Sequence, residues 1–165
     1  MPEDAHKPPP VAIVVSRYNA SITDALEAGA RDEYARRGGD PADLSVLPAP
    51  GTFELTVLAS AAAQRFAAVV ALGCVVKGET SHDQHLASAV AHGLTDVSVR
   101  TGTPVAFGVL TVDTVEQARE RAGGRQGNKG AEAMSAVLDT LESLRALESG
   151  KQAASSQRPD KAGAR

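Results

Sequence analysis

The chain has 165 residues, a formal net charge of −3, 42% hydrophobic residues and only 3% aromatic residues. This length fits one domain with an adequate core, and the slight negative charge excludes a broad nucleic-acid-binding surface. No apolar run approaches the roughly 20 residues that cross a bilayer, the first ten residues do not resemble a signal peptide, and the single Cys74 cannot form an internal disulfide. We therefore expect a cytoplasmic protein that binds neither nucleic acid nor membrane.

Three segments differ in composition. Residues 1–9 are polar and rich in proline, which predicts a flexible arm because proline lacks a backbone donor and disfavours helix. Residues 10–148 carry the periodic apolar patterns of a single α/β domain. Residues 149–165 contain alanine, serine and charge without such a pattern, and this predicts a disordered tail.

Apolar runs alternate with helical patterns along the domain. The runs predict buried strands at 11–15, 44–47, 67–76 and 105–111. The helical patterns predict helices at about 22–37 (with Ser21 and Asp24 as the cap), 52–66, 83–99 (with a break near Gly93 as an alternative), 114–122 (with a capping box at Thr114) and 131–147. Residues 123–130 form a glycine-rich basic loop. The alternation predicts a flavodoxin-like, doubly wound, four-stranded parallel sheet with helices on both faces.

One stretch, residues 73–85, has the features of a functional site. A buried strand breaks at Gly78 and passes through a polar loop into a helix, whose first N–H groups and positive dipole end suit an anion such as phosphate. His82 lies there and can move protons near neutral pH, the alternative being a histidine that only caps the helix. The spacing of His82 and His85 also suits a metal, but no third ligand stands nearby.

Other polar segments follow the remaining strands and are expected to meet at the same edge of the sheet. Tyr18 and Phe53 are either core residues or aromatic rings that stack on a flat heterocycle. Glu54 complements a helix dipole or binds a ligand, while Arg121 and Lys129 flank the glycine-rich loop with charge that suits phosphate. The residues alone predict a small-molecule site for a phosphorylated, heterocyclic ligand.

These motifs together resemble the lumazine synthase family (6,7-dimethyl-8-ribityllumazine synthase). The resemblance extends over about residues 11–145, and the basic-Gly-x-Thr-x-His block joined to Asn-Lys-Gly is its most specific part. The matching segments are Ser16–Asn19, Pro50–Glu54, Gly73–His82, Pro104–Thr111, Glu120–Gly123 and Gly127–Gly130.

The resemblance implies an enzyme of riboflavin biosynthesis, a transferase that uses no cofactor and no metal. It would condense 5-amino-6-(D-ribitylamino)uracil with 3,4-dihydroxy-2-butanone 4-phosphate and release phosphate and water. His82 corresponds to the proton-transfer histidine. The substrate-binding positions implied are Tyr18 (stacking), Thr52, Phe53 and Glu54 (ribityl chain and ring), Cys74, Val75 and Val76 (uracil edge), Glu79, Thr80, Arg121 and Lys129 (phosphate), and Phe107 (contributed by a neighbouring subunit).

The resemblance further implies a homo-oligomer, a pentamer or a multiple of it up to an icosahedral shell, with active sites between subunits. The sequence departs from the family where Tyr18 replaces the more usual phenylalanine or tryptophan, and where residues 83–85 replace an aromatic-containing segment. Two alternatives remain open: an archaeal-type riboflavin synthase acting on the lumazine, and a non-catalytic binding or shell protein with a flavin-sized pocket.

Overall fold

A computed structural model describes residues 7–150 of the chain. Its main sheet has four parallel strands in the order β2-β1-β3-β4, which confirms the expected architecture. The elements are β1 Val11–Ser16, α1 Ala20–Arg36, the 3-10 turn η1 Pro41–Asp43, β2 Leu44–Ala49, α2 Leu55–Ala62, β3 Ala68–Val76, α3 His82–Thr101, β4 Val105–Val112, α4 Val115–Arg121, β5 Ala122–Gly124, β6 Gly127–Asn128 and α5 Lys129–Glu148.

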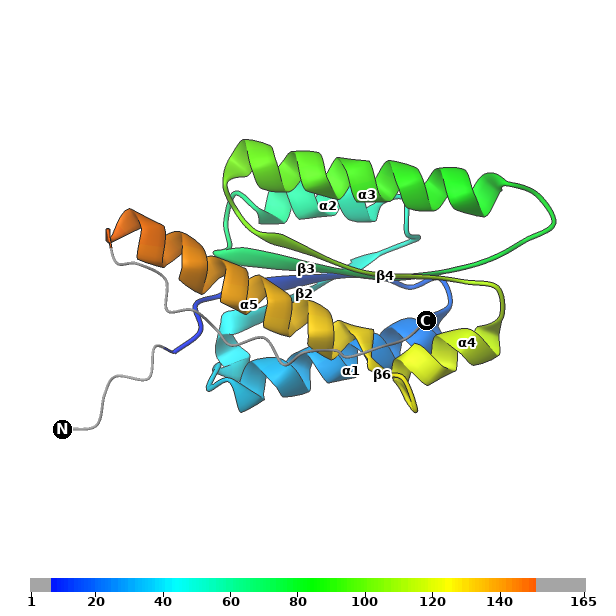
Figure 1. Ribbon diagram of the computed structural model, residues 1–165, viewed down its shortest axis with the longest axis horizontal. Coiled ribbons are helices and arrows are strands. Elements are labelled where there is room, and N and C mark those ends of the chain that lie inside the picture. The colour runs from blue at the N-terminus through cyan, green and yellow to red at the C-terminus, as the bar shows by residue number, and fades with distance from the viewer. Residues whose placement is uncertain (1–6, 151–165) are drawn as a thin grey trace, which may run out of the picture.

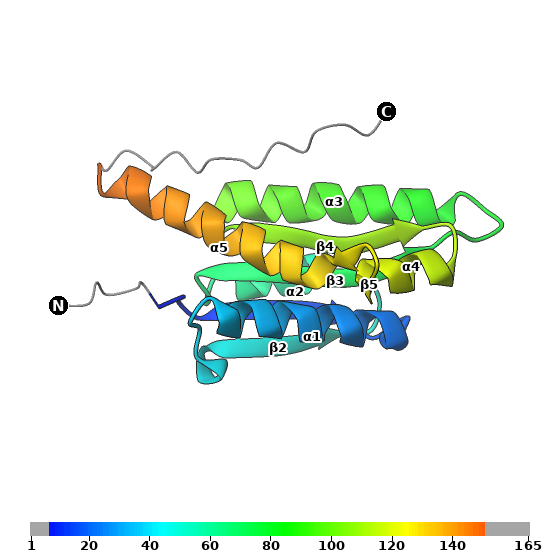
Figure 2. The ribbon, with the colours of Figure 1, turned by 60° about the horizontal axis from the view of Figure 1, so that its bottom comes forward.

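The sheet lies between two helical layers (Figures 1 and 2). Helices α2 and α3 cover one face, while α1, α4 and α5 cover the other. The central strands β1 and β3 are buried on both faces, as their unbroken apolar runs predict. On the α5 side, the apolar stripe that includes Met134, Val137 and Leu138 packs into the core, whereas Leu144 at its end is only half-buried.

Several element boundaries differ from the sequence-based expectation for identifiable reasons. Helix α1 begins at Ala20, so Ser21 is not its cap, and the Asp24 carboxylate instead pairs with Arg17 at 3.0 Å. Helix α2 is shorter than expected because residues 52–54 form a turn before it and the chain turns again after Ala62 to enter β3. Thr114 caps α4 as predicted, accepting a 3.2 Å hydrogen bond from the Gln117 N–H.

Helix α3 runs without the break considered near Gly93. The glycine is there for close packing of two helices, since a Cβ at this position would lie 2.6 Å from Thr56 Cγ2 of α2. The expected glycine-rich loop contains a short antiparallel pair, β5 and β6, in which Gly123 and Gly127 adopt positive φ angles. Neither the close packing at Gly93 nor the short β5–β6 pair can be predicted from the spacing of apolar residues in the sequence.

The Asn128-Lys129-Gly130 segment joins α5 to α1. The Asn128 side chain caps α5 by accepting from Gly130 N–H (2.8 Å) and Ala131 N–H (3.2 Å), and its amide donates to the Ala25 carbonyl of α1 at 2.9 Å. A Cβ at Gly130 would overlap the Leu26 carbonyl oxygen, so only glycine permits this approach of the two helices. Asn128 and Gly130 therefore have a structural role.

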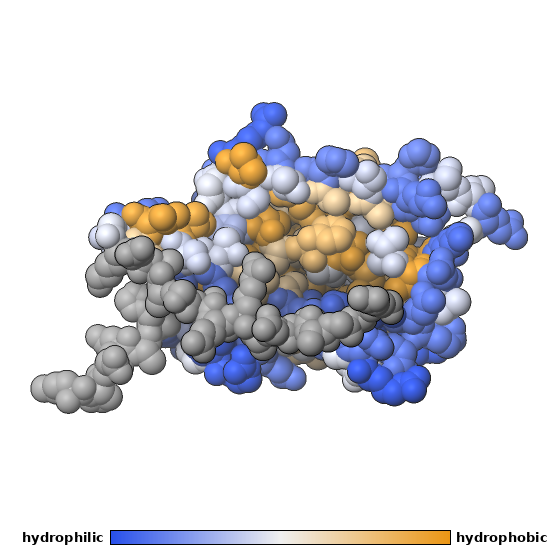
Figure 3. Space-filling view, in the orientation of Figure 1, coloured by the Kyte–Doolittle hydropathy of each residue, from blue (hydrophilic) through white to orange (hydrophobic). Residues whose placement is uncertain are grey.

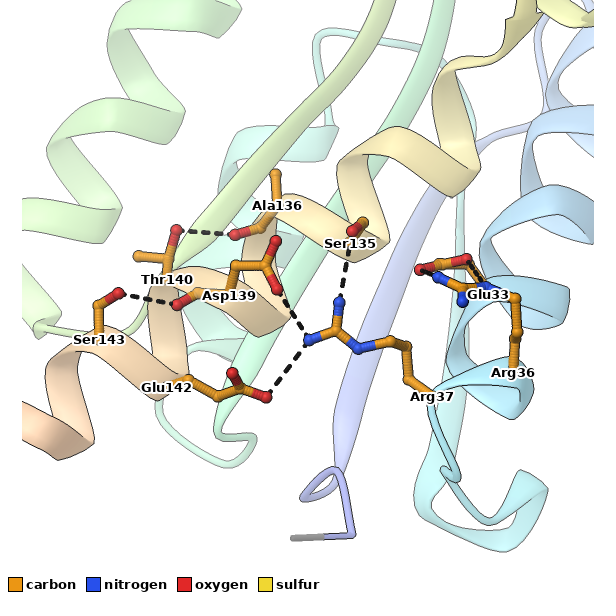
Figure 4. A network of polar contacts seen from close by, with 9 residues as sticks. All are labelled: Glu33, Arg36, Arg37, Ser135, Ala136, Asp139, Thr140, Glu142 and Ser143. Carbon is orange, nitrogen blue, oxygen red and sulfur yellow. Dashed lines mark hydrogen bonds and ion pairs between the residues drawn. The ribbon is translucent and has the colours of Figure 1, made fainter. Parts of the chain in front are cut away.

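A second contact between α1 and α5 is ionic (Figure 4). Arg37, directly after α1, donates to the carboxylates of Asp139 (2.7 Å) and Glu142 (3.3 Å) on α5. The hydrogen bond with Asp139 raises the pKa of the Arg37 guanidinium above its usual value. Within residues 7–150, the neighbouring Arg36 pairs only with Glu33, three residues earlier in its own helix.

The N-terminal segment is partly described. Within the arm expected at 1–9, Pro8 is buried, Lys7 pairs with Asp43 at 2.8 Å, and the buried Tyr34 hydroxyl donates to the Pro9 carbonyl at 2.9 Å. Residues 1–6 of the arm and 151–165 of the expected tail lie outside the described residues. Across residues 7–150, no helix is long and apolar enough to cross a membrane.

Candidate active site

A cavity of about 660 Å³ opens beside the carboxyl ends of β1, β2 and β3, at the α2–α3 side of the sheet. Its volume is in the range of small-molecule sites. Nine of the thirteen predicted site residues line it: Tyr18, Thr52, Phe53, Glu54, Cys74, Val75, Val76, Thr80 and His82. The cavity also has five lining residues that were not among the predicted site residues: Asn19, Gly51, Gly78, Asp83, which was expected to serve the helix N-terminus, and Leu86.

The turn after β1 positions Tyr18 through an unusual backbone conformation. Asn19 has φ 59° and ψ 46°, the left-handed region that asparagine tolerates better than most residues. Its side-chain amide donates to the Cys74 carbonyl at 2.9 Å, and its own carbonyl accepts from the N–H groups of Ile22 and Thr23. Asn19 therefore fixes both the start of α1 and the end of β3, and leaves Tyr18 70% exposed beside the cavity.

The turn after β2 supplies a second group of lining residues. Thr52 is 5% exposed, and a Cβ at Gly73 would lie 3.1 Å from its hydroxyl, so glycine lets the threonine pack directly on β3. Phe53 is 65% exposed, which is unusual for a large aromatic ring in a chain with so few. Tyr18 and Phe53 are thus available to a ligand and do not belong to the core.

The end of β3 forms the cavity wall. Burial raises the pKa of the Cys74 thiol to about 11, so this side chain is a neutral, unreactive group at physiological pH. Residues 74–76 stay paired with β4 but extend beyond Leu72, the last β3 residue paired with β1, and the Lys77 N–H donates to the Val112 carbonyl at 2.8 Å. Beyond it, the loop carries Gly78 and Thr80 along the cavity edge.

Helix α3 begins at the cavity. Ser81 at the N-cap makes no side-chain capping bond, so the first N–H groups of the helix remain available to an anion. His82, the first residue of α3, is exposed and lines the cavity, as a proton-transfer group requires. The described residues contain no cluster of three or more His, Cys, Asp or Glu side chains suited to a metal ion.

Four predicted site residues do not line this cavity: Glu79, Phe107, Arg121 and Lys129. Glu79 lies in the loop before α3, while Lys129 pairs with Glu132 at 2.6 Å. Arg121 donates to the Gln117 carbonyl within α4, on the opposite side of the sheet from α3. Phe107, 46% exposed on the edge strand β4, pairs with Ala71, four residues before the cavity-lining Val75.

The face that carries β4 is apolar. Figure 3 shows hydrophobic residues gathered between α3 and α5, in the part of the surface over this edge strand. Phe107 and the half-buried Val105 and Ala106 belong to this strand. Edge strands of this kind present unpaired backbone groups together with apolar side chains.

Comparison with known proteins identifies the family. The model of the 6,7-dimethyl-8-ribityllumazine synthase family matches residues 9–145, which is most of the chain. The chain belongs to this family. It is 48% identical over 139 residues to a 6,7-dimethyl-8-ribityllumazine synthase of Thermus thermophilus, covering 83% of this chain and 88% of that protein. The synthase of Campylobacter curvus is 44% identical over 133 residues, covering 79% and 85% respectively.

The family membership confirms the resemblance seen in the sequence, and it agrees with the observed α/β fold. Asn19 and Asp83 are the polar cavity residues that sequence reasoning missed. The side chain of Asn19 acts on a carbonyl 55 residues away, which no local pattern reveals. Asp83 left a signal in the sequence, because it occupies the first position of the buried stripe of α3.

Proposed function

We propose that this protein is a 6,7-dimethyl-8-ribityllumazine synthase. It condenses 5-amino-6-(D-ribitylamino)uracil with 3,4-dihydroxy-2-butanone 4-phosphate in riboflavin biosynthesis, as a transferase that needs no cofactor. The observation that supports this most strongly is one cavity that combines His82, two exposed aromatic rings and a helix N-terminus, in a member of this family. We also propose that the protein acts in the cytoplasm.

In this proposal the cavity binds the pyrimidine substrate by stacking on its ring and by hydrogen bonding to its polar uracil edge. Tyr18 and Phe53 offer aromatic surface to the ring, and the backbone at Cys74–Val76 offers hydrogen-bonding groups to the uracil edge. Glu54 and the adjacent Thr52 lie where the hydroxyls of the ribityl chain need acceptors. Holding the amine of one substrate beside the ketone of the other supplies much of the rate enhancement.

His82 moves the protons of the reaction. Imine formation joins the amine nitrogen to the ketone carbon and releases water, so a hydroxyl must be protonated as it leaves. Phosphate elimination removes a proton from carbon as the bond from carbon to the phosphate oxygen breaks. Ring closure joins the second amine nitrogen to the remaining carbonyl carbon and releases a second water, so another hydroxyl must be protonated as it leaves. A positioned imidazole typically accelerates such steps by about 10²–10⁴-fold. Thr80 and the first N–H groups of α3 hold the phosphate until it leaves.

Three of the four remaining predicted residues act, in this proposal, on the cavity of a neighbouring copy. Phe107, Arg121 and Lys129 lie outside the cavity of their own chain, and Phe107 stands on an apolar edge strand suited to subunit contact. A ring in which each site takes residues from two copies makes all sites equivalent, as cyclic symmetry requires. We propose a homo-oligomer of this kind, a pentamer or a multiple of it.

Purified protein mixed with both substrates tests the reaction. Lumazine formation, followed by absorbance and matched by phosphate release, should exceed the uncatalysed rate. Incubation with the lumazine alone is the second arm, because a riboflavin synthase would make riboflavin from it and this protein should not. Ligand binding without turnover in a folded oligomer would contradict the enzymatic proposal and support the binding-protein alternative.

Mixed oligomers test the shared site. The variants His82→Ala and Arg121→Ala are each expected to be impaired. When the two are co-expressed in equal amounts, about a quarter of the sites should have both residues intact if each site spans two copies. Activity should therefore rise well above that of either variant alone. No recovery in oligomers shown to contain both variants would contradict the intersubunit site.

A further inference from the structure

The buried face of α3 contains a carboxylate. Successive buried positions of this helix are Asp83, Val90, Leu94 and Val97, with the half-buried Leu86 between the first two. These positions follow helical spacing and form one stripe that packs on the sheet and α2. Asp83 lies at the N-terminal end of that stripe, at a position where helical spacing predicts an apolar side chain.

The Asp83 carboxylate has no protein partner. The residue is only 9% exposed, yet among residues 7–150 no hydrogen bond or ion pair includes its side chain. Among the described residues only Thr23 Oγ1 is a fully buried side-chain polar atom without a hydrogen-bond partner, so the Asp83 carboxylate oxygens keep accessible surface although the rest of the residue is covered. Asp83 lines the cavity, so a bound molecule can supply the missing donor.

A purely structural explanation is the helix dipole. An acidic residue in the first turn of a helix stabilises it modestly when it is exposed to solvent. Asp83 is buried, however, and it makes no capping hydrogen bond to the N–H groups of its own helix. The helix dipole explains why a negative charge lies near this helix end. It does not explain why Asp83 lies on the buried stripe of the helix.

The chemistry of the cavity indicates which ligand group Asp83 binds. An ionised carboxylate accepts hydrogen bonds from hydroxyl and amino groups and cannot donate one. Glu54, a second carboxylate, lines the same cavity together with the hydroxyl of Thr52. We propose that Asp83 is a specificity-determining residue that accepts a hydrogen bond from a hydroxyl or amino group of the pyrimidine substrate. This inference rests on the proposed function and extends it to a residue outside the predicted site.

Asp83→Leu separates this role from the structural one. It completes the apolar stripe and removes a carboxylate that no described residue pairs with, so the ligand-free variant should melt at the same temperature as the wild type or higher. Binding of 5-amino-6-(D-ribitylamino)uracil alone, measured by calorimetry, should weaken by about 10–100-fold, because a hydrogen bond to a charged acceptor is lost. Asp83→Asn keeps the shape of the side chain and removes its charge, so it should also bind the pyrimidine more weakly. This variant replaces Asp83→Leu in the test if Asp83→Leu does not fold.

Two substrate analogues identify the donor. 5-Amino-6-(pentylamino)uracil lacks the chain hydroxyls, and 6-(D-ribitylamino)uracil lacks the 5-amino group. The difference in affinity between wild type and Asp83→Leu should disappear for the first analogue if Asp83 binds a hydroxyl, and for the second if it binds the amine. The matched control is Asp96→Asn, which removes an exposed carboxylate of the same helix and should leave binding unchanged.

Four results would overturn the inference. A lower melting temperature of Asp83→Leu with unchanged affinity would assign Asp83 to the helix dipole. An equal loss of affinity for the substrate and for both analogues would indicate a general disturbance of the cavity. Wild-type protein that binds none of the three pyrimidines would refute the proposed function as well. Normal wild-type binding and turnover with unaffected Asp83 variants would refute this inference alone.

Discussion

Asn128→Ala should destabilise the protein by about 2 kcal/mol, because its side chain makes two kinds of contact. Loss of the cap on α5, where Oδ1 accepts from Gly130 N–H and Ala131 N–H, costs about 1 kcal/mol. Loss of the bond from Nδ2 to the Ala25 carbonyl of α1 costs about 1 kcal/mol more. For a chain of this size the sum corresponds to a fall in melting temperature of about 4–8 °C.

Asn128→Ser separates the two contributions. A serine hydroxyl caps the helix but cannot reach α1, so this variant should lose only about 1 kcal/mol. Urea unfolding at a single protein concentration measures both variants, since association between copies would otherwise change the apparent stability. If both variants lay within about 0.5 kcal/mol of the wild type, or if they were equally unstable, the bridge between α5 and α1 would not stabilise the fold as described.

Three further predictions concern single side chains. Cys74 should resist alkylation by iodoacetamide at pH 8 and react on unfolding, because burial raises its thiol pKa to about 11; rapid labelling of folded protein would contradict this. Arg37→Met should lower the free energy of unfolding by about 0.5–1 kcal/mol, more than Arg36→Met, whose ion pair lies within one helix; equal losses in urea unfolding would refute the cross-helix role. Gly93→Ala should cost about 1–3 kcal/mol, because its Cβ would press on Thr56 Cγ2, and an unchanged melting temperature would show that α2 and α3 separate easily.

The fold was predictable where the determining signals are local. Unbroken apolar runs mark strands buried on both faces, and alternation with helical patterns leaves few topologies other than the observed parallel sheet. Thr114 followed by Gln117 is a local capping signal, and it was correct. The Ser21 cap was wrong because α1 begins one residue earlier, at Ala20, after Asn19 in a left-handed backbone conformation, which the capping pattern does not record.

The site was predictable to the extent that it consists of segments following strands, because parallel strands bring their carboxyl ends to one edge. The sequence does not reveal that Asn19 bonds to the Cys74 carbonyl, since this contact depends on how distant elements pack. It also does not reveal that Arg121 lies away from the cavity of its own chain, whereas the family resemblance already implied this for Phe107. A motif records that residues act together, but not that they belong to one copy.

The rate of lumazine formation by His82→Ala, compared with wild type at saturating concentrations of both substrates, tests the central claim most directly. We predict a fall of about 10²–10⁴-fold in kcat, with product still forming above the uncatalysed rate because the cavity continues to hold both substrates. His92→Ala is the matched control, since this exposed histidine of α3 bonds to the Ser88 carbonyl outside the cavity and its loss should leave the rate unchanged. A wild-type rate equal to the uncatalysed one, or an unimpaired His82→Ala enzyme, would contradict the proposed active site.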